Sequence, residues 1–106
     1  MTFNQIAEKL KTVYKHFDNI RVGLAGSYAN NTNTVDSDID IVLDGDSMRV
    51  EIMEYIKSLF DITVDVLWVE LMRSEDEELD NLALAYDLPV NTDSVYKTVM
   101  REVRWI

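Results

Sequence analysis

The sequence predicts an α/β (α+β) protein in which helices pack on a small mixed β-sheet. Short apolar runs with strand character alternate along the chain with amphipathic stretches that have helical periodicity. The connections between them permit both parallel crossovers and antiparallel pairing. The 106 residues, of which 47% are hydrophobic and 28% charged, suit a single domain over 1–106.

The chain is expected to begin with a helix and a buried strand. Thr2 and Gln5 have the spacing of a capping box, in which each side chain accepts from the other residue's backbone N–H. Apolar residues then recur at helical spacing from 3 to 17, which predicts one amphipathic helix. The apolar run 20–25 ends at Gly26 and predicts a strand.

A short helical turn and a second strand are expected next. Residues 27–29 can open the turn, and the polar stretch after them reads as a loop. The stretch 38–43 alternates between polar and apolar residues, which predicts a strand with Asp38 and Asp40 on the same face. Asp44-Gly45-Asp46 has the composition of a turn.

A helix and a third strand are expected to follow. Ser47 can cap a helix that runs to about residue 60. The residues expected to face inward from this helix are Val50, Met53, Ile56 and Phe60. The run 62–69 is β-branched and aromatic, which predicts a strand, and Asp65 lies in its middle.

Two more helices and an edge strand complete the prediction. An acidic helix over 74 to about 86 is expected to open with a Ser-x-x-Glu capping box. Thr92 or Asp93 can cap a final helix that turns Val95 toward the core. Residues 103–106 suit an edge strand.

The composition argues against several classes of function. Twenty Asp and Glu residues against ten Lys and Arg give a formal net charge of −10 at pH 7. Such a charge repels nucleic-acid backbones, so direct nucleic-acid binding is not expected. The chain has no cysteine and one histidine, His16, which excludes thiol chemistry and His-rich metal sites. No apolar run reaches membrane-spanning length and no signal peptide is visible, so a cytoplasmic location is expected.

Three carboxylates form the candidate metal site. Asp38 and Asp40 are two residues apart on one predicted strand and therefore point to the same face. Asp65 joins them if the third strand lies beside the second. Carboxylates gathered in this way repel one another unless cations neutralise them. Oxygen ligands favour Mg²⁺ or Mn²⁺, and two such ions suit in-line displacement at phosphorus.

Gly26-Ser27 supplies a complementary site for phosphate. A glycine at the end of a strand allows the backbone to approach a phosphate closely. The N–H groups at the start of the following helical turn present a partial positive charge, and Ser27 adds a hydroxyl donor. A phosphate can therefore be bound in spite of the acidic surface.

These motifs resemble those of the DNA polymerase β-type nucleotidyltransferase superfamily. Gly26-Ser27 is followed after ten residues by Asp38-Ile39-Asp40 and later by Asp65 on a strand. The matching stretches are 25–29, 37–42 and 63–67. At this length the chain is similar to the minimal nucleotidyltransferases (MNT), and the similarity extends over nearly all of it.

The resemblance implies a polymerase β-like nucleotidyltransferase fold and transfer of AMP from ATP to a hydroxyl. Asp38 and Asp40 would bind the metal ions, and Asp65 would complete the site and assist the attacking hydroxyl. Gly26 and Ser27 would hold the terminal phosphates of the nucleotide. Similar stand-alone domains act as antitoxins of HEPN ribonuclease toxins, so the implied acceptor is a side chain of a HEPN-type toxin.

One departure from the family pattern affects the phosphate site. Many members carry Arg-Gly where this chain has Asn30 and Asn31, so a basic contact is missing from the loop. Five arginines are candidates to replace it: Arg21, Arg49, Arg73, Arg101 and Arg104. The sequence does not choose among them.

Two other functions stay open. The chain can be a binding module that neutralises its partner by contact, with a vestigial nucleotide site. Alternatively, it can modify a small-molecule hydroxyl in a pocket completed by oligomerisation. The acceptor, the base preference and the oligomeric state are not specified by the sequence.

Other readings of the same residues fit poorly. An EF-hand would place ligands at Asp36, Asp38 and Asp40, but Ile41 and Ser47 stand where it needs Gly and Glu. A hydrolase with Ser27 as nucleophile would need an imidazole base, and His16 lies in the first predicted helix.

Overall fold

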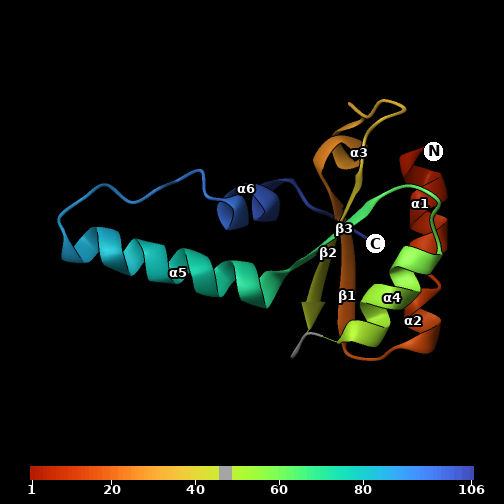
Figure 1. Cartoon of the computed structure of the whole chain (residues 1–106), viewed down its shortest axis with the longest axis horizontal. Helices are drawn as coiled ribbons and strands as arrows, with labels where there is room; N and C mark the ends of the chain where they lie inside the picture. The colour runs from red at the N-terminus through yellow and green to blue at the C-terminus, as the bar shows by residue number, and fades with distance from the viewer. Residues whose placement is uncertain (46–48) are drawn as a thin grey trace.

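The computed structural model describes residues 1–45 and 49–106 (Figure 1). The helices and strands of these residues are, in chain order, α1 (Phe3–Leu10), α2 (Val13–His16), β1 (Ile20–Ala25), α3 (Gly26–Asn30), β2 (Ile39–Gly45), α4 (Val50–Ser58), β3 (Val64–Trp68), α5 (Val69–Ala85), α6 (Val95–Glu102) and β4 (Arg104–Trp105).

The strands form a mixed sheet, which confirms the predicted α/β (α+β) class. Their order in the sheet is β3-β2-β1-β4. β1 pairs antiparallel with both β2 and β4, and β2 pairs parallel with β3. A parallel pair needs a crossover connection, and α4 lies within the one between β2 and β3. β3 and β4 are the two edge strands of this order.

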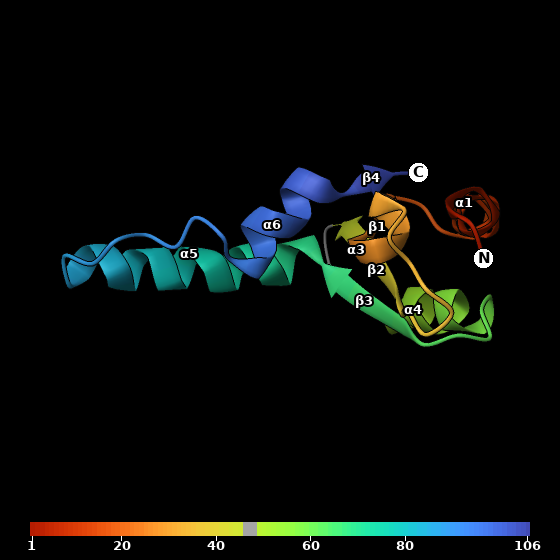
Figure 2. The same cartoon turned by 90° about the horizontal axis from the view of Figure 1, so that it is seen from above.

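Helices cover the two faces of the sheet unequally. On one face α1, α2 and α4 enclose the larger core, whose fully buried members include Ile6, Leu24, Ile41 and Ile52. On the other face the start of α5 and the helix α6 pack around Ala25 and Val42. The rest of α5 projects past the sheet (Figures 1 and 2). The projection explains the elongated envelope of 46 × 31 × 18 Å.

The helix predicted over 3–17 is divided in two. The Thr2–Gln5 capping box forms as predicted and opens α1. At the break the Thr12 hydroxyl donates to the carbonyl of Lys9 at 2.7 Å, and the Thr12 N–H bonds to the same carbonyl at 3.2 Å. These local bonds interrupt the regular hydrogen bonding of the α-helix, so a second helix, α2, begins at Val13.

The acidic helix begins earlier than predicted. α5 starts at Val69, directly after β3, and therefore passes through Ser74 where a cap was expected. Val69 and Met72 are buried against Ala25 and Val42. Tertiary burial thus overrides the local capping signal, and it shortens the predicted strand 62–69 to Val64–Trp68.

Three smaller expectations are also corrected. In α4 the inward positions include Ile52, fully buried, whereas Val50 is 64% exposed, because Ile52 and Ile56 share the face that meets the core. α6 is capped by Ser94, whose side chain accepts from the Lys97 N–H, and Val95 is consequently exposed. Asp44 and Gly45 belong to β2 rather than to a turn. The expected cap Ser47 and the turn residue Asp46 lie outside the described residues.

Across residues 1–45 and 49–106, no helix has both the length and the apolar character that a membrane crossing requires.

Candidate active site

Two of the predicted site residues are direct neighbours in the sheet. In the parallel register of β2 and β3, Asp40 lies opposite Asp65, and on its other side Asp40 lies opposite Ala25 of β1. Residues opposite each other in a register point to the same face of the sheet. That face also carries Val42, against which α5 packs. The two carboxylates therefore lie on the α5 side of the sheet, at the start of their strands.

The Asp40 carboxyl is in an environment that disfavours its charge. Burial raises the pKa of Asp40 above its ordinary value, and the carboxylates of Asp65 and Asp38 raise this pKa further. Asp40 is partly buried, whereas Asp65, on the edge strand, is exposed. The site thus combines a sheltered carboxylate with an accessible one.

Gly26 brings the start of α3 against Asp40. Its φ is +68°, in the left-handed region that glycine adopts without strain. A Cβ atom at this position would overlap Oδ2 of Asp40. The helix start has Ala25 as its N-cap and no side-chain cap bond. The start of α3 therefore lies against the Asp40 carboxylate, and Ser27 is the next residue of this helix.

Asp38 is less closely associated with the site than predicted. It is exposed and lies one residue before β2, because that strand begins at Ile39, whose N–H bonds to the Thr63 carbonyl at 3.0 Å. Within the described residues, no three Asp, Glu or His side chains are close enough together to hold a metal ion. Asp38 acts on Asp40 through its charge.

The donor set nevertheless fits a divalent cation. Carboxylate oxygens are the ligands that hard cations prefer. Burial is the main cause of the raised pKa of Asp40, and the charges of Asp65 and Asp38, which raise it further, are ones that a cation would offset. The residues that would hold such an ion are Asp38, Asp40 and Asp65.

The structure distinguishes the five candidate arginines by their contacts. Arg49 donates to the Asp18 carbonyl, Arg73 pairs with Glu70, and Arg101 pairs with Asp93. The Arg21 guanidinium lies over the ring of Trp105, 4.0 Å from its centroid.

Arg104 is the candidate that contacts α3. Its Nη1 donates to the Ala29 carbonyl at 3.3 Å, and its guanidinium lies 3.7 Å from the ring centroid of Phe3. The contact arises because β4 pairs with β1, which places Arg104 opposite Leu24. Local sequence gives no signal for this pairing, which joins segments about 80 residues apart.

Comparison with protein families identifies the class to which this fold and site belong. The family model of the nucleotidyltransferase domain matches residues 4–105. The chain belongs to this family, and its mixed sheet with packed helices is consistent with a polymerase β-like nucleotidyltransferase fold. Members generally use a nucleoside triphosphate and a divalent metal ion, and membership supports nucleotidyl transfer as the activity. No curated protein matches the chain at a significant level.

Proposed function

We propose that this protein transfers AMP from ATP to a hydroxyl of a partner protein, and that the partner is a HEPN-type ribonuclease toxin for which it serves as antitoxin in the cytoplasm. The observation that carries the transfer reaction is the pairing of Asp40 with Asp65 beside the left-handed Gly26. Two carboxylates and a phosphate-accessible backbone are the parts that nucleotidyl transfer needs.

Each residue has a role in this proposal. Asp38, Asp40 and Asp65 hold Mg²⁺ or Mn²⁺, which neutralises the charge of the phosphates when bound. The N–H groups after Gly26 and the Ser27 hydroxyl bind the terminal phosphates. The acceptor oxygen attacks the α-phosphorus, pyrophosphate leaves, and the exposed carboxylate of Asp65 takes the proton of the hydroxyl.

Two features support a protein as the acceptor. Asp65 lies exposed on an edge strand, where a hydroxyl on a large molecule can reach it. The net charge of −10 favours a partner with a basic surface. An enzyme that cleaves RNA needs such a surface, because it binds the negatively charged phosphate backbone. The identity of the partner as a HEPN-type toxin rests on the family resemblance.

The test is transfer in a defined mixture. The protein, ATP, Mg²⁺ and a purified HEPN-type toxin are incubated, and the intact mass of the toxin is measured. We expect a gain of one AMP or a multiple of it. Asp40→Asn should slow the reaction by roughly a thousandfold, since it removes a metal-binding charge next to Asp65.

A contact inhibitor is the second candidate, favoured by Asn30 and Asn31 at the places where many relatives carry Arg-Gly. Co-expression of the toxin with the Asp38→Asn/Asp40→Asn variant separates the two. Full protection with an unmodified toxin would establish inhibition by contact and disprove the transfer mechanism.

A further inference from the structure

α5 leaves large apolar side chains exposed to water both in its first turn and in its projecting part. Leu71, Leu79 and Leu82 are 48%, 60% and 50% exposed. Their spacing, with Glu75 between the first two, places all of them along one side of the helix. At 1.5 Å per residue the stripe is about 16 Å long, or three helical turns. This is the length of a helix-binding surface.

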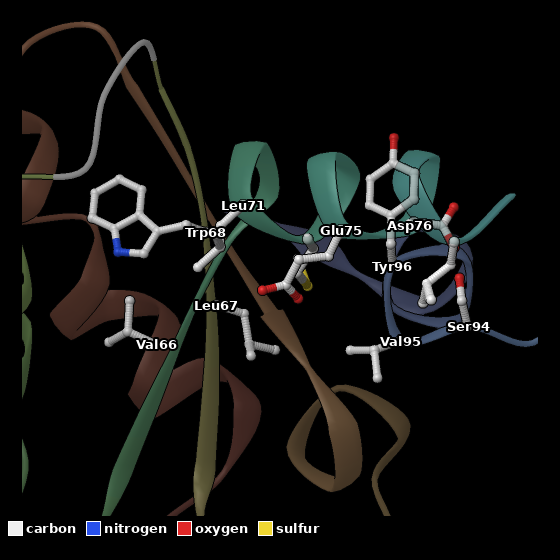
Figure 3. Close-up of a pocket in the computed structure, with 11 residues that line it drawn as sticks. Val66, Leu67, Trp68, Leu71, Glu75, Asp76, Ser94, Val95 and Tyr96 are labelled. Atoms are coloured by element: carbon white, nitrogen blue, oxygen red, sulfur yellow. The ribbon is translucent and has the colours of Figure 1, made fainter. Parts of the chain in front are cut away.

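The stripe borders a groove. The groove has a volume of about 310 Å³ and lies between the end of β3, α5 and α6 (Figure 3). Its apolar lining includes Leu67, Met72, Val95 and Tyr96. Because β3 is an edge strand, the next strand position beside it is free among the described residues.

Acidic groups line and surround these apolar side chains. Glu75 projects from α5 into the groove (Figure 3). The acidic residues of α5 are Glu70, Glu75, Asp76, Glu77, Glu78 and Asp80, against a single basic residue, Arg73. An apolar groove with this rim is complementary to a ligand that is both apolar and cationic.

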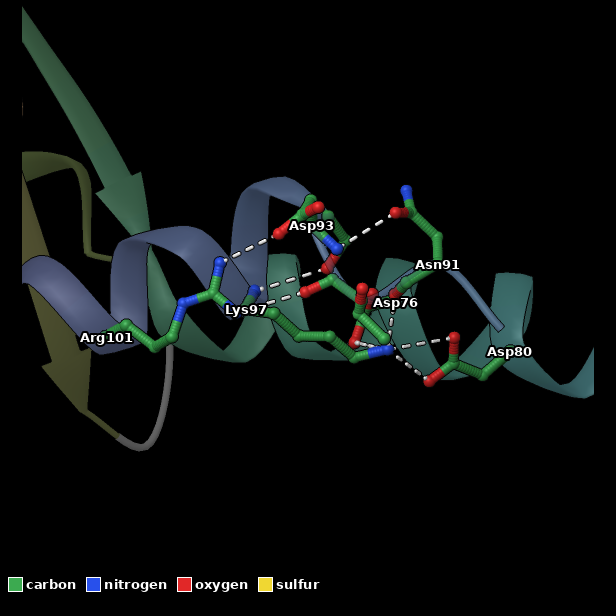
Figure 4. A network of polar contacts seen from close by, with 8 residues as sticks. Asp76, Asp80, Asn91, Asp93, Lys97 and Arg101 are labelled. Atoms are coloured by element: carbon green, nitrogen blue, oxygen red, sulfur yellow. Dashed lines mark hydrogen bonds and ion pairs between the residues drawn. The ribbon is translucent and has the colours of Figure 1, made fainter. Parts of the chain in front are cut away.

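Asp76 gives an independent sign of a missing partner. It lines the groove and is only 6% exposed. Its Oδ1 accepts no hydrogen bond from the described residues, and its Oδ2 lies 3.7 Å from Nζ of Lys97 (Figure 4). A buried carboxylate oxygen without a donor is costly, so a donor supplied by a bound partner would stabilise it.

We propose that the groove between β3, α5 and α6 docks a basic amphipathic helix of a partner protein. The apolar side of that helix covers Leu71, Leu79 and Leu82, and a Lys or Arg side chain reaches Asp76. A second copy of this chain fits poorly, since two copies with a net charge of −10 would repel each other. The inference goes beyond the transfer reaction and holds equally for a domain that only binds.

The test uses a fluorescent helical peptide of about 18 residues, with leucines on one face and lysines elsewhere. Binding is followed by fluorescence anisotropy. We expect binding that weakens as salt rises. Two control peptides should each bind at least about tenfold more weakly. One has the same composition with scattered leucines and lacks the apolar face. The other has Glu in place of Lys and lacks the positive charge.

Variants locate the binding surface. Leu79→Gln/Leu82→Gln should weaken peptide binding by at least about tenfold. The control is Leu84→Gln, which changes a leucine that is 68% exposed, does not line the groove and lies on another side of α5 than Leu79 and Leu82. Asp76→Asn should also weaken binding of the lysine peptide. Circular dichroism of each variant shows whether it retains the fold.

Three results would overturn the proposal. The first is equal binding of all three peptides, or binding that the Leu79/Leu82 variant leaves unchanged. The second is a dimer in sedimentation equilibrium that the same variant dissociates, which would assign the groove to a second copy. The third is binding to lipid vesicles in place of the peptide. Peptide binding needs no nucleotide, so its failure and a failure of AMP transfer are seen in separate assays.

Discussion

Gly26 and Asp40 occupy the same small space at the end of β1. The absence of a side chain at Gly26 makes room for the Asp40 carboxylate, and the φ of +68° turns the chain there into α3. Asp40 in turn is held opposite Asp65 by the parallel register. The start of α3, proposed to bind phosphate, and the Asp40 carboxylate are therefore positioned by one contact.

Gly26→Ala tests this contact. The new methyl group would strain the left-handed backbone and displace Asp40, so we expect a loss of at least about 1 kcal/mol in the free energy of unfolding. Nucleotidyl transfer should fall by at least about a hundredfold, because small displacements in an active site are costly. The control is Gly45→Ala, at the other end of β2. Its new methyl group would lie 3.0 Å from the Asn19 carbonyl oxygen, so it should lower the stability of the fold but leave the rate of transfer by the folded protein unchanged.

The raised pKa of Asp40 predicts a pH dependence of stability. The native state binds the Asp40 proton more tightly than the unfolded chain, so ionised Asp40 destabilises the metal-free fold. This penalty is complete above the native pKa, and it disappears as the pH falls below the ordinary value of 3.8. Metal-free Asp40→Asn should therefore melt higher than the wild type at pH 7, by roughly 2 °C after allowance for solvent screening.

The difference in melting temperature should shrink as the pH is lowered toward 4. The control Asp61→Asn removes an exposed carboxylate outside the site and shows how much of the difference comes from net charge alone. A difference that is constant over this pH range would mean that Asn acts by packing or hydrogen bonding rather than by removing a charge.

Sequence patterns could place most of the candidate site because they depend on local geometry. The period of two in 38–43 puts Asp40 on the side opposite to the core residue Ile41, as the structure confirms. Asp38 was expected on the strand with Asp40, but its place depends on where pairing with the neighbouring strand begins. Gly26 was expected to admit a phosphate, and no local pattern indicates that it also makes room for Asp40.

At the scale of elements, Lys97 of α6 makes polar contacts that join this helix to α5. Nζ of Lys97 donates to Asp80 at 3.0 and 3.2 Å and to the Asn91 carbonyl at 2.8 Å, and lies 3.7 Å from Asp76 (Figure 4). Lys97 and Asp80 are each 27% exposed, so these interactions are partly shielded from water. The network fixes the return of the chain along α5.

Lys97→Met should lower the free energy of unfolding by about 2 kcal/mol, because it leaves the carboxylate of Asp76 buried without a nearby cation. Adding Asp76→Asn should recover part of this loss, since the buried charge is then gone. Lys11→Met is the matched control: it breaks an exposed pair with Glu8 and should leave the free energy of unfolding nearly unchanged. Urea unfolding measures all three, and equal small losses for Lys97→Met and Lys11→Met would show that the network contributes little.

Element boundaries were predicted well where local signals act alone. The Thr2–Gln5 capping box and the strand 20–25 are found as predicted. α5 starts five residues before the position that the Ser-x-x-Glu pattern at 74–77 predicts, because burial of Val69 and Met72 extends the helix toward β3. Such burial depends on residues distant in the sequence and leaves no local signal.

At the scale of the molecule, the strand order is the part that local patterns could not supply. Pairing of β4 with β1 joins the C-terminal strand to the first strand of the chain, and it brings Arg104 to the helix α3. The family match over 4–105 includes the projecting α5 as well as the sheet. The projecting part of α5 therefore lies within the span of the nucleotidyltransferase domain.

Ligand binding at the site should stabilise the whole molecule against unfolding. A ligand that binds only the native state raises its stability by RT ln(1 + [L]/Kd), about 2.7 kcal/mol at a hundredfold excess over Kd. Mg²⁺ or Mn²⁺ with ATP should therefore raise the melting temperature, and should do so more than either alone, because cation and phosphates neutralise each other within the acidic site. EDTA should reverse the rise.

Asp40→Asn/Asp65→Asn should abolish this stabilisation, since it removes two neighbouring carboxylates of the sheet. The control Asp18→Asn/Asp61→Asn changes the net charge by the same amount at exposed positions outside the site, and should keep the full response. Should both double variants respond equally, the effect of the cation would come from general screening of the −10 charge, and the carboxylates of β2 and β3 would not be its binding site. Differential scanning fluorimetry across a titration of Mg²⁺ at fixed ATP distinguishes the two, because screening needs far higher concentrations than a specific site.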